Sequence, residues 1–222
     1  MKLAVLLLGP PASGKSTLTR QLAGQHDMHT FRLREYARQR AKAEPALAAA
    51  MNDGADPLGW LPDRVATSLV RDAVTGLLGP SGRASSVVFE GYPGNAYQAT
   101  HLARLLDGLP TVALVLRVNE TTTRQRAQGR RVCPACTTED GEPHRPARIH
   151  RLGVCADCGS PVRRRSSDVP ARFALRTERF LQHLPSIRAA LTAQGVPWRS
   201  IDAGQSPAQV LAAAQIHLKG DS

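Results

Sequence analysis

Short apolar runs recur along the 222-residue chain and predict buried β-strands at residues 3–8, 86–90, 111–118 and 196–201. The first run does not alternate with polar residues, which is typical of a strand buried on both faces of a parallel sheet. Between the runs, apolar residues recur at helical spacing, and we expect helices near residues 17–26, 62–77, 98–106, 119–126, 169–184 and 207–218. Strands that alternate with helices predict an α/β fold with a parallel, doubly wound sheet.

Two segments interrupt this alternation and divide the predicted core. Residues 32–61 have a helical composition with little apolar content, and we expect them to form a small helical insert. Residues 130–165 show no sustained apolar period and contain many arginines and all four cysteines. The sequence therefore predicts a core made of residues 1–31, 62–129 and 166–222, with two inserted segments.

The composition changes this interpretation mainly through its charge. The formal net charge is +11, and only Lys2, Lys15, Lys42 and Lys219 of the 29 basic residues are lysines. Ten of the arginines lie between Arg124 and Arg165, and a basic segment of this kind suits polyphosphate. We do not expect a nucleic-acid partner. The apolar run after Lys2 is shorter than the core of a secretory signal and leads directly into a glycine-containing loop. We therefore expect a cytoplasmic protein without a membrane span.

The first predicted strand leads into a loop that matches GxxxxGK[ST] at Gly9, Gly14, Lys15 and Ser16. Such a loop closes backbone N–H groups around a phosphate chain, the lysine reaches the terminal phosphates, and the hydroxyl binds Mg²⁺. Glu90 ends another predicted strand and is expected near this loop, because ligands of doubly wound sheets bind at the carboxyl ends of the strands. A simple turn between strand and helix is the alternative. The candidate ATP-binding residues of the loop are Gly9, Pro10, Pro11, Ala12, Ser13, Gly14, Lys15, Ser16 and Thr17.

The cysteines form two CxxC pairs, Cys133 with Cys136 and Cys155 with Cys158. This spacing lies in the range of a four-cysteine zinc site, in which each pair supplies two thiolates from one tight turn. Disulfides are the alternative, but a cytoplasmic chain argues against them. His144 and His150 lie between the pairs and are expected to be solvated. We therefore predict structural zinc.

Taken together, these motifs resemble the adenylate kinase family of nucleoside monophosphate kinases, in the form with a zinc-bearing lid. The resemblance covers essentially the whole chain. It rests on the phosphate loop, the Leu61-Pro62-Asp63 motif, Glu90-Gly91-Tyr92-Pro93 followed by Gln98, the lid entrance Arg126-x-x-Gly129-Arg130-Arg131-x-Cys133, and the pair Arg165 and Arg176. It implies a five-stranded P-loop core, an acceptor-binding insert at 32–61 and a zinc lid at 130–165.

The resemblance also implies the reaction, transfer of the ATP γ-phosphoryl group to a nucleoside monophosphate or a similar phosphorylated acceptor. Lys15, Arg130, Arg165 and Arg176 would then neutralise the transferring group, and Arg126 would hold the donor adenine. Glu90 would hold magnesium, directly or by orienting its waters. The family is mostly monomeric, and we expect a monomer. The implied acceptor-binding residues are Arg38, Trp60, Gly91, Gly94 and Gln98.

The acceptor side departs from the family pattern. Gly94 replaces the arginine that grips the acceptor phosphate, and Leu33-Arg34-Glu35 replaces a Thr-Gly-Asp segment. Trp60 replaces a smaller apolar residue, and Arg32 or Arg34 is a candidate substitute for the lost arginine. Two other functions remain open at this point: a P-loop kinase of a non-nucleotide or nucleic-acid-end acceptor, and a non-catalytic ATP-binding module.

Overall fold

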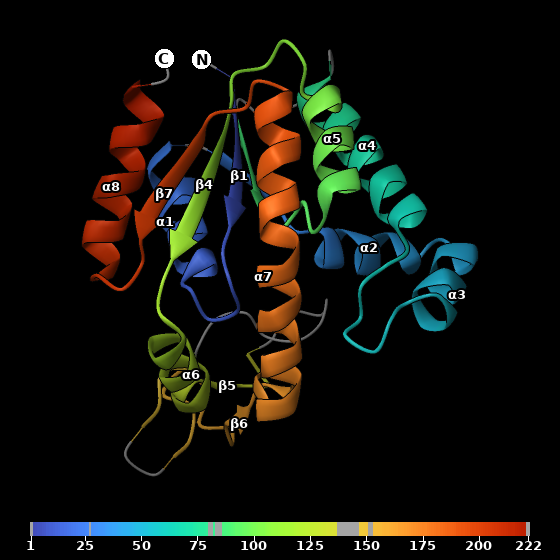
Figure 1. Cartoon of the computed structure of the whole chain (residues 1–222). Helices are drawn as coiled ribbons and strands as arrows, with labels where there is room; N and C mark the ends of the chain where they lie inside the picture. Colours follow the sequence, from blue (N-terminus) through green and yellow to red (C-terminus); the bar gives the residue numbers. More distant parts are fainter. Residues whose placement is uncertain are drawn as a thin grey trace.

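The computed structural model of the chain describes residues 2–26, 28–79, 82, 86–136, 147–150 and 153–220. Among them, five parallel strands form one sheet in the order β2-β3-β1-β4-β7 (Figure 1). Their bounds are β1 Leu3–Leu8, β2 Met28–Phe31, β3 Ser86–Glu90, β4 Thr111–Arg117 and β7 Trp198–Asp202. The doubly wound α/β fold is confirmed.

Helices cover both faces of this sheet because the central strand β1 carries apolar side chains on both sides. Leu6 and Leu8 pack toward α4 (Asp63–Leu78), α5 (Ala96–Leu105) and α7 (Pro170–Ala193). Val5 and Leu7 pack toward α1 (Lys15–His26) and α8 (Pro207–Gly220). Residues 4–7 of β1 are fully buried, as the unbroken apolar run predicts for a parallel sheet.

The edge strand β2 was not apparent in the apolar pattern. Its sequence, Met28-His29-Thr30-Phe31, is half polar, and it pairs with β3 alone. An edge strand does not need apolar residues on every position, so hydrophobicity gives a weak signal there. The resemblance, and not the apolar runs, accounts for the correct expectation of five strands.

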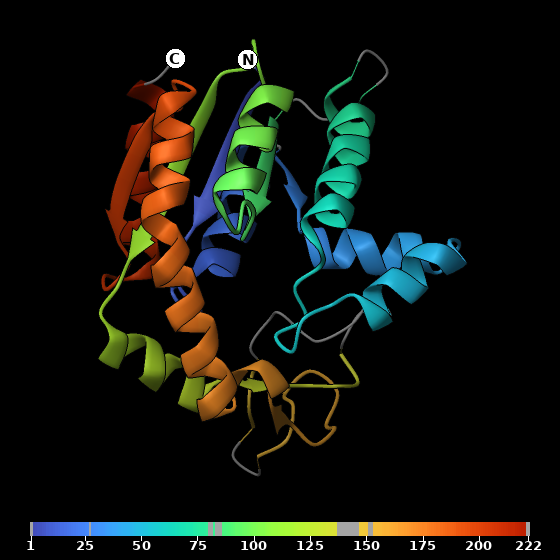
Figure 2. The same ribbon diagram turned by 45° about the vertical axis from the view of Figure 1, so that its right-hand side comes forward.

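The insert predicted at 32–61 contains two helices, α2 (Leu33–Ala41) and α3 (Pro45–Asp53). They project from one side of the core (Figure 2). Ala37 and Leu47 pack against Leu69 of α4 in a small cluster separate from the two that flank the sheet. The two helices of the insert are therefore anchored to the core through apolar contacts with α4.

The cysteine-containing segment lies at the end of the molecule that the carboxyl ends of the strands face (Figure 1). Helix α6 (Glu120–Gly129) leads into it, and β5 (Arg131–Val132) pairs with β6 (Arg163–Arg164) at its base. A short 3₁₀ helix, η1 (Ser166–Asp168), then leads into α7. Residues 137–146, 151 and 152, and with them His144, lie outside the described residues.

Candidate active site

The loop after β1 has the geometry of a phosphate cradle. Gly9, Ala12 and Gly14 have positive φ angles of 157°, 59° and 103°. At Gly9 a Cβ atom would lie 2.7 Å from Ser13 Oγ and 3.0 Å from Leu116 Cβ, so the curled backbone needs glycine there. The loop ends at the N-terminus of α1, where backbone N–H groups and the helix dipole favour an anion.

Lys15 is folded back into the loop. Its Nζ donates to the carbonyl oxygens of Gly9 at 2.5 Å and of Pro10 at 2.8 Å. Burial lowers the pKa of Lys15 to about 7; nearby Glu90 raises it, while Arg176, Arg130 and Arg165 lower it further. The lysine therefore lies in a strongly cationic environment, which a polyphosphate would relieve.

Glu90 lies opposite the loop because β3 pairs in register with β1, with Glu90 beside Leu7. Ser16 Oγ donates to Glu90 Oε1, and Arg32 Nε donates to Glu90 Oε2 at 2.7 Å. The carboxylate is 9 % exposed. A hydroxyl and a carboxylate at one point supply the hard oxygen donors that Mg²⁺ prefers, so these residues fit a magnesium site.

Arginines from distant parts of the chain converge on the same cavity of about 770 Å³. The cavity is lined by Arg130 at the end of α6, Arg165 before η1, Arg176 on α7 and Arg34 on α2. Burial, and then the charges of Arg165 and Arg34, lower the pKa of Arg176 to about 10. Such a set of like charges is typical of a polyanion site.

Arg130 is held in place by an acid that the sequence analysis did not identify. Its Nε and Nη2 donate to the two oxygens of Asp168 at 2.7 and 2.6 Å, and the Asp168 side chain is fully buried. This bidentate pair fixes the guanidinium at the cavity wall. No local motif marks Asp168, because its partner lies 38 positions away.

The predicted acceptor side is organised by a network of amides and a carboxylate. Gln98 is buried, accepts from the Gly94 backbone N–H at 2.8 Å and donates to Asp63 at 2.7 Å. Asn95 also donates to Asp63, at 2.9 Å. Gln98 therefore positions the turn after β3. Asp63 and Asn95 are its positioning partners: the Leu61-Pro62-Asp63 motif contains Asp63 without giving it a role, and the sequence analysis did not identify Asn95.

The structure brings most of the predicted site residues to one place. The cavity is lined by candidates from the loop, the phosphoryl and donor sites and the acceptor side: Lys15, Ser16, Glu90, Arg126, Arg130, Arg165, Arg176, Trp60, Gly91, Gly94 and Gln98. Arg126 donates to the Ser13 carbonyl at 3.5 Å. Two predicted site residues are not among the described residues that line the cavity: Pro10 of the loop, which is buried, and Arg38. The role of Arg38 as an acceptor residue stays a prediction.

The four cysteines also come together. Their sulfur atoms all lie within 4.8 Å of one another, and none forms a disulfide. The Sγ atoms of Cys133 and Cys158 lie 3.5 Å apart, and those of Cys136 and Cys155 lie 3.7 Å apart. Four sulfurs about 2.3 Å from a tetrahedral zinc would lie about 3.8 Å apart, so the cluster fits that metal. His150 is exposed.

The fold and the site define a P-loop phosphotransferase of the nucleoside monophosphate kinase class. The chain is 31 % identical to an adenylate kinase of Erythrobacter litoralis over 168 residues, covering 74 % of this chain and 75 % of the relative. It is 27 % identical to an adenylate kinase of Caldanaerobacter subterraneus over 98 % of this chain and 96 % of that protein. It is 30 % identical to that of Symbiobacterium thermophilum over 78 % of each. No family model matches the chain. The chain belongs to the adenylate kinase family.

Among the described residues, no helix combines the length and apolarity that crossing a membrane requires.

Proposed function

We propose that this protein transfers the γ-phosphoryl group of ATP to a nucleoside monophosphate. The observation that carries the proposal is the convergence of Lys15 and the arginines of α6, η1 and α7 on the cavity that also holds the carboxylate of Glu90. Phosphoryl transfer between two phosphates brings several negative charges together, and catalysis consists mainly of positioning and neutralising them. No general base is needed, because the acceptor phosphate is already an anion.

In this mechanism the phosphate loop binds the ATP phosphates, and Lys15 exchanges its carbonyl partners for phosphate oxygens. Arg130, Arg165 and Arg176 neutralise the transferring group, and Arg126 contacts the donor base. Ser16 and Glu90 are the residues that would hold Mg²⁺, which supplies charge neutralisation across the phosphates when bound. Gln98 and the turn at Gly91 form the acceptor side.

We assign the inserted segments to substrate coverage. Residues 32–61 form the acceptor-binding insert, and residues 130–165 form a lid that closes over the nucleotides and excludes water. The four cysteines hold the lid together around structural zinc, because the segment has few apolar residues to form a core of its own. We further propose that the protein is a cytoplasmic monomer.

The deciding experiment measures ADP formation from MgATP with a panel of nucleoside monophosphates. Transfer to at least one of them is expected, and the Lys15→Ala variant is expected to lose it. An exposed arginine on α4 provides the control, as Arg64→Ala should leave the rate unchanged. A panel without any turnover would refute the proposed function, and transfer by Lys15→Ala would refute the role of the loop.

A further inference from the structure

The glycine at position 94 makes room for the ring of Trp60. Gly94 does not have a positive φ angle, so its backbone conformation alone does not require glycine. A Cβ atom there would, however, lie 2.9 Å from both Cζ3 and Cη2 of the Trp60 ring, closer than real Cβ contacts come. The edge of the indole therefore occupies the space that a side chain at position 94 would need.

Side chains of helix α7 hold the same ring. The guanidinium carbon of Arg179 lies 4.7 Å from the ring centroid, and the imidazole of His183 stacks on the indole with a centroid distance of 6.0 Å and an interplanar angle of 29°. Arg179 also pairs with Asp56, whose Oδ1 accepts from the Trp60 backbone N–H at 2.9 Å. Cation–π and stacking contacts of this kind fix the orientation of the indole.

Trp60 lines the active-site cavity, whereas Arg179 and His183 are not among the described residues that line it. The indole is partly exposed, so it is backed by α7 and presents its remaining surface to the cavity. Leu61 and Phe180 add apolar surface to the same cavity. The acceptor side therefore offers a ligand a flat aromatic wall.

Two polar side chains of the acceptor side, Gln98 and Tyr92, are not arranged to read the edge of a base. Gln98 is 4 % exposed, its Oε1 accepts from the Gly94 N–H at 2.8 Å, and its Nε2 donates to Asp63 at 2.7 Å. Both ends of this amide thus hold the turn after β3. Tyr92 is 1 % exposed, and its hydroxyl is buried in the cavity wall.

We propose that the acceptor base stacks on Trp60, and that the site takes nucleoside monophosphates with little selection among their bases. Every base has a π face, so stacking on an aromatic ring tolerates any of them. Strong selection needs hydrogen-bonding groups that the wrong ligand leaves unpaired, and an apolar wall discriminates far less. The inference rests on the proposed function and adds the class of acceptor.

Calorimetry on the full-length protein tests the base selectivity, with AMP, CMP, GMP and UMP as the probes. Their dissociation constants should lie within about tenfold of one another, because stacking is the main contact with the base. Trp60→Leu should weaken the binding of all four by about 5- to 150-fold, and Trp60→Phe, which keeps an aromatic ring, should retain most of the affinity. The affinity for ATP should not change in either variant.

The second tryptophan of the chain provides the matched control. Trp198 lies on β7 and is not among the described residues that line the cavity, so Trp198→Leu should bind the four monophosphates as the parent protein does. Circular dichroism and a cooperative urea transition would establish that each variant is folded. One monophosphate bound more than about tenfold better than the other three, or a fall of less than about fivefold in Trp60→Leu, would overturn the inference.

Fluorescence gives a readout that a merely structural role of Trp60 would not produce. In the Trp198→Phe variant Trp60 is the remaining tryptophan, and saturating AMP should change its emission intensity. Ribose 5-phosphate, which carries the phosphate without a base, should leave the emission unchanged. An equal response to ribose 5-phosphate, or no response to a monophosphate that calorimetry shows to bind, would overturn the stacking on Trp60.

Binding and turnover together separate this inference from the proposed function. Even, Trp60-dependent binding of the four monophosphates without any transfer would support the inference and refute the proposed function. Transfer to one monophosphate, with strong selection against the other three, would support the proposed function and overturn the inference.

Discussion

The ion pair between Arg130 and Asp168 allows the most quantitative prediction. Both guanidinium contacts are short, at 2.7 and 2.6 Å, and Asp168 is fully buried whereas Arg130 is 17 % exposed. Asp168→Ala would leave Arg130 near Arg165 and Arg176 without a counter-charge. Leaving one member of a buried pair uncompensated costs about 3–5 kcal/mol. We expect about 3 kcal/mol, because Arg130 borders the cavity and can be rehydrated there.

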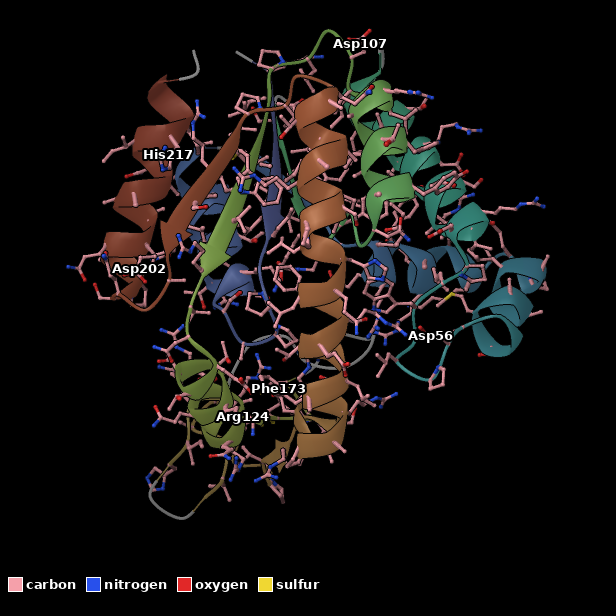
Figure 3. All side chains as sticks on the ribbon, viewed as in Figure 1. Asp56, Asp107, Arg124, Phe173, Asp202 and His217 are labelled. Atoms are coloured by element: carbon pink, nitrogen blue, oxygen red, sulfur yellow. The ribbon has the colours of Figure 1, made fainter. Side chains whose placement is uncertain are left out.

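Urea denaturation provides the assay, with the midpoint and slope fitted together. The control is the exposed ion pair of Glu120 with Arg124 on α6, the helix that Arg130 follows; Figure 3 labels Arg124. Its side chains are 60 % and 62 % exposed, and Glu120→Ala should cost less than about 1 kcal/mol. Asp168→Ala should also lower kcat, since the guanidinium at the cavity wall loses its orientation. Equal losses of stability in the two variants would refute the assignment of Asp168 as a buried positioning residue.

Three further predictions concern the lid, the insert and the turn after β3. Chelation of zinc from purified protein should unfold the lid and abolish transfer while the sheet stays folded, as measured by metal analysis, activity and hydrogen exchange; protein that contains no zinc when isolated without chelator would contradict this. Asp56→Asn should cost about 0.5–1 kcal/mol at pH 7, because it keeps the oxygen that accepts backbone N–H groups and loses the charge opposite Arg179. Burial raises the pKa of Asp56, but the backbone N–H of Trp60 and the guanidinium of Arg179 have the larger combined effect and hold the pKa below its ordinary value of 3.8. The difference in stability between the parent protein and Asp56→Asn should therefore be complete above pH 3.8 and disappear as the pH falls through the lowered pKa. A stability difference that persists in acid would contradict the ion pair. Gly94→Ala should cost about 1–3 kcal/mol by overpacking against Trp60, a loss that Trp60→Leu should remove, and an unchanged urea midpoint would show that the ring moves aside.

The sequence predicts the parts of this fold that depend on local signals. The unbroken apolar run of β1 and the glycine and lysine spacing after it locate the phosphate loop, because backbone curvature there requires specific residues at fixed offsets. The two CxxC pairs predict the sulfur cluster because each pair supplies two thiolates from one tight turn. The half-polar strand β2 gives no such signal, since only its pairing with β3 defines it.

The remaining site residues depend on contacts between distant segments. Asp168 acquires its role only when η1 lies against the end of α6, and Asp63 only when α4 lies against the turn that carries Gln98. The sequence analysis left Arg32 and Arg34 as equal candidates. In the structure Arg32 donates to the carboxylate of Glu90 and Arg34 donates to the backbone carbonyl of Leu58, contacts that no spacing along the chain reveals.

The basic residues of the chain matter more through the convergence of several arginines on one cavity than through the net charge that they give the protein. Arg34, Arg165 and Arg176 come from three separate elements and repel one another, and this repulsion together with burial lowers the pKa of Arg176. Such a cluster is unfavourable in the empty site, and a phosphate placed among the guanidinium groups reverses the sign of each interaction. Nucleotide binding is thus coupled to the stability of the fold, because the ligand compensates charges that the native structure holds together and the unfolded chain separates. For the same reason the site should bind acceptors that carry a phosphate more tightly than neutral ones, because only a charged acceptor compensates the clustered arginines.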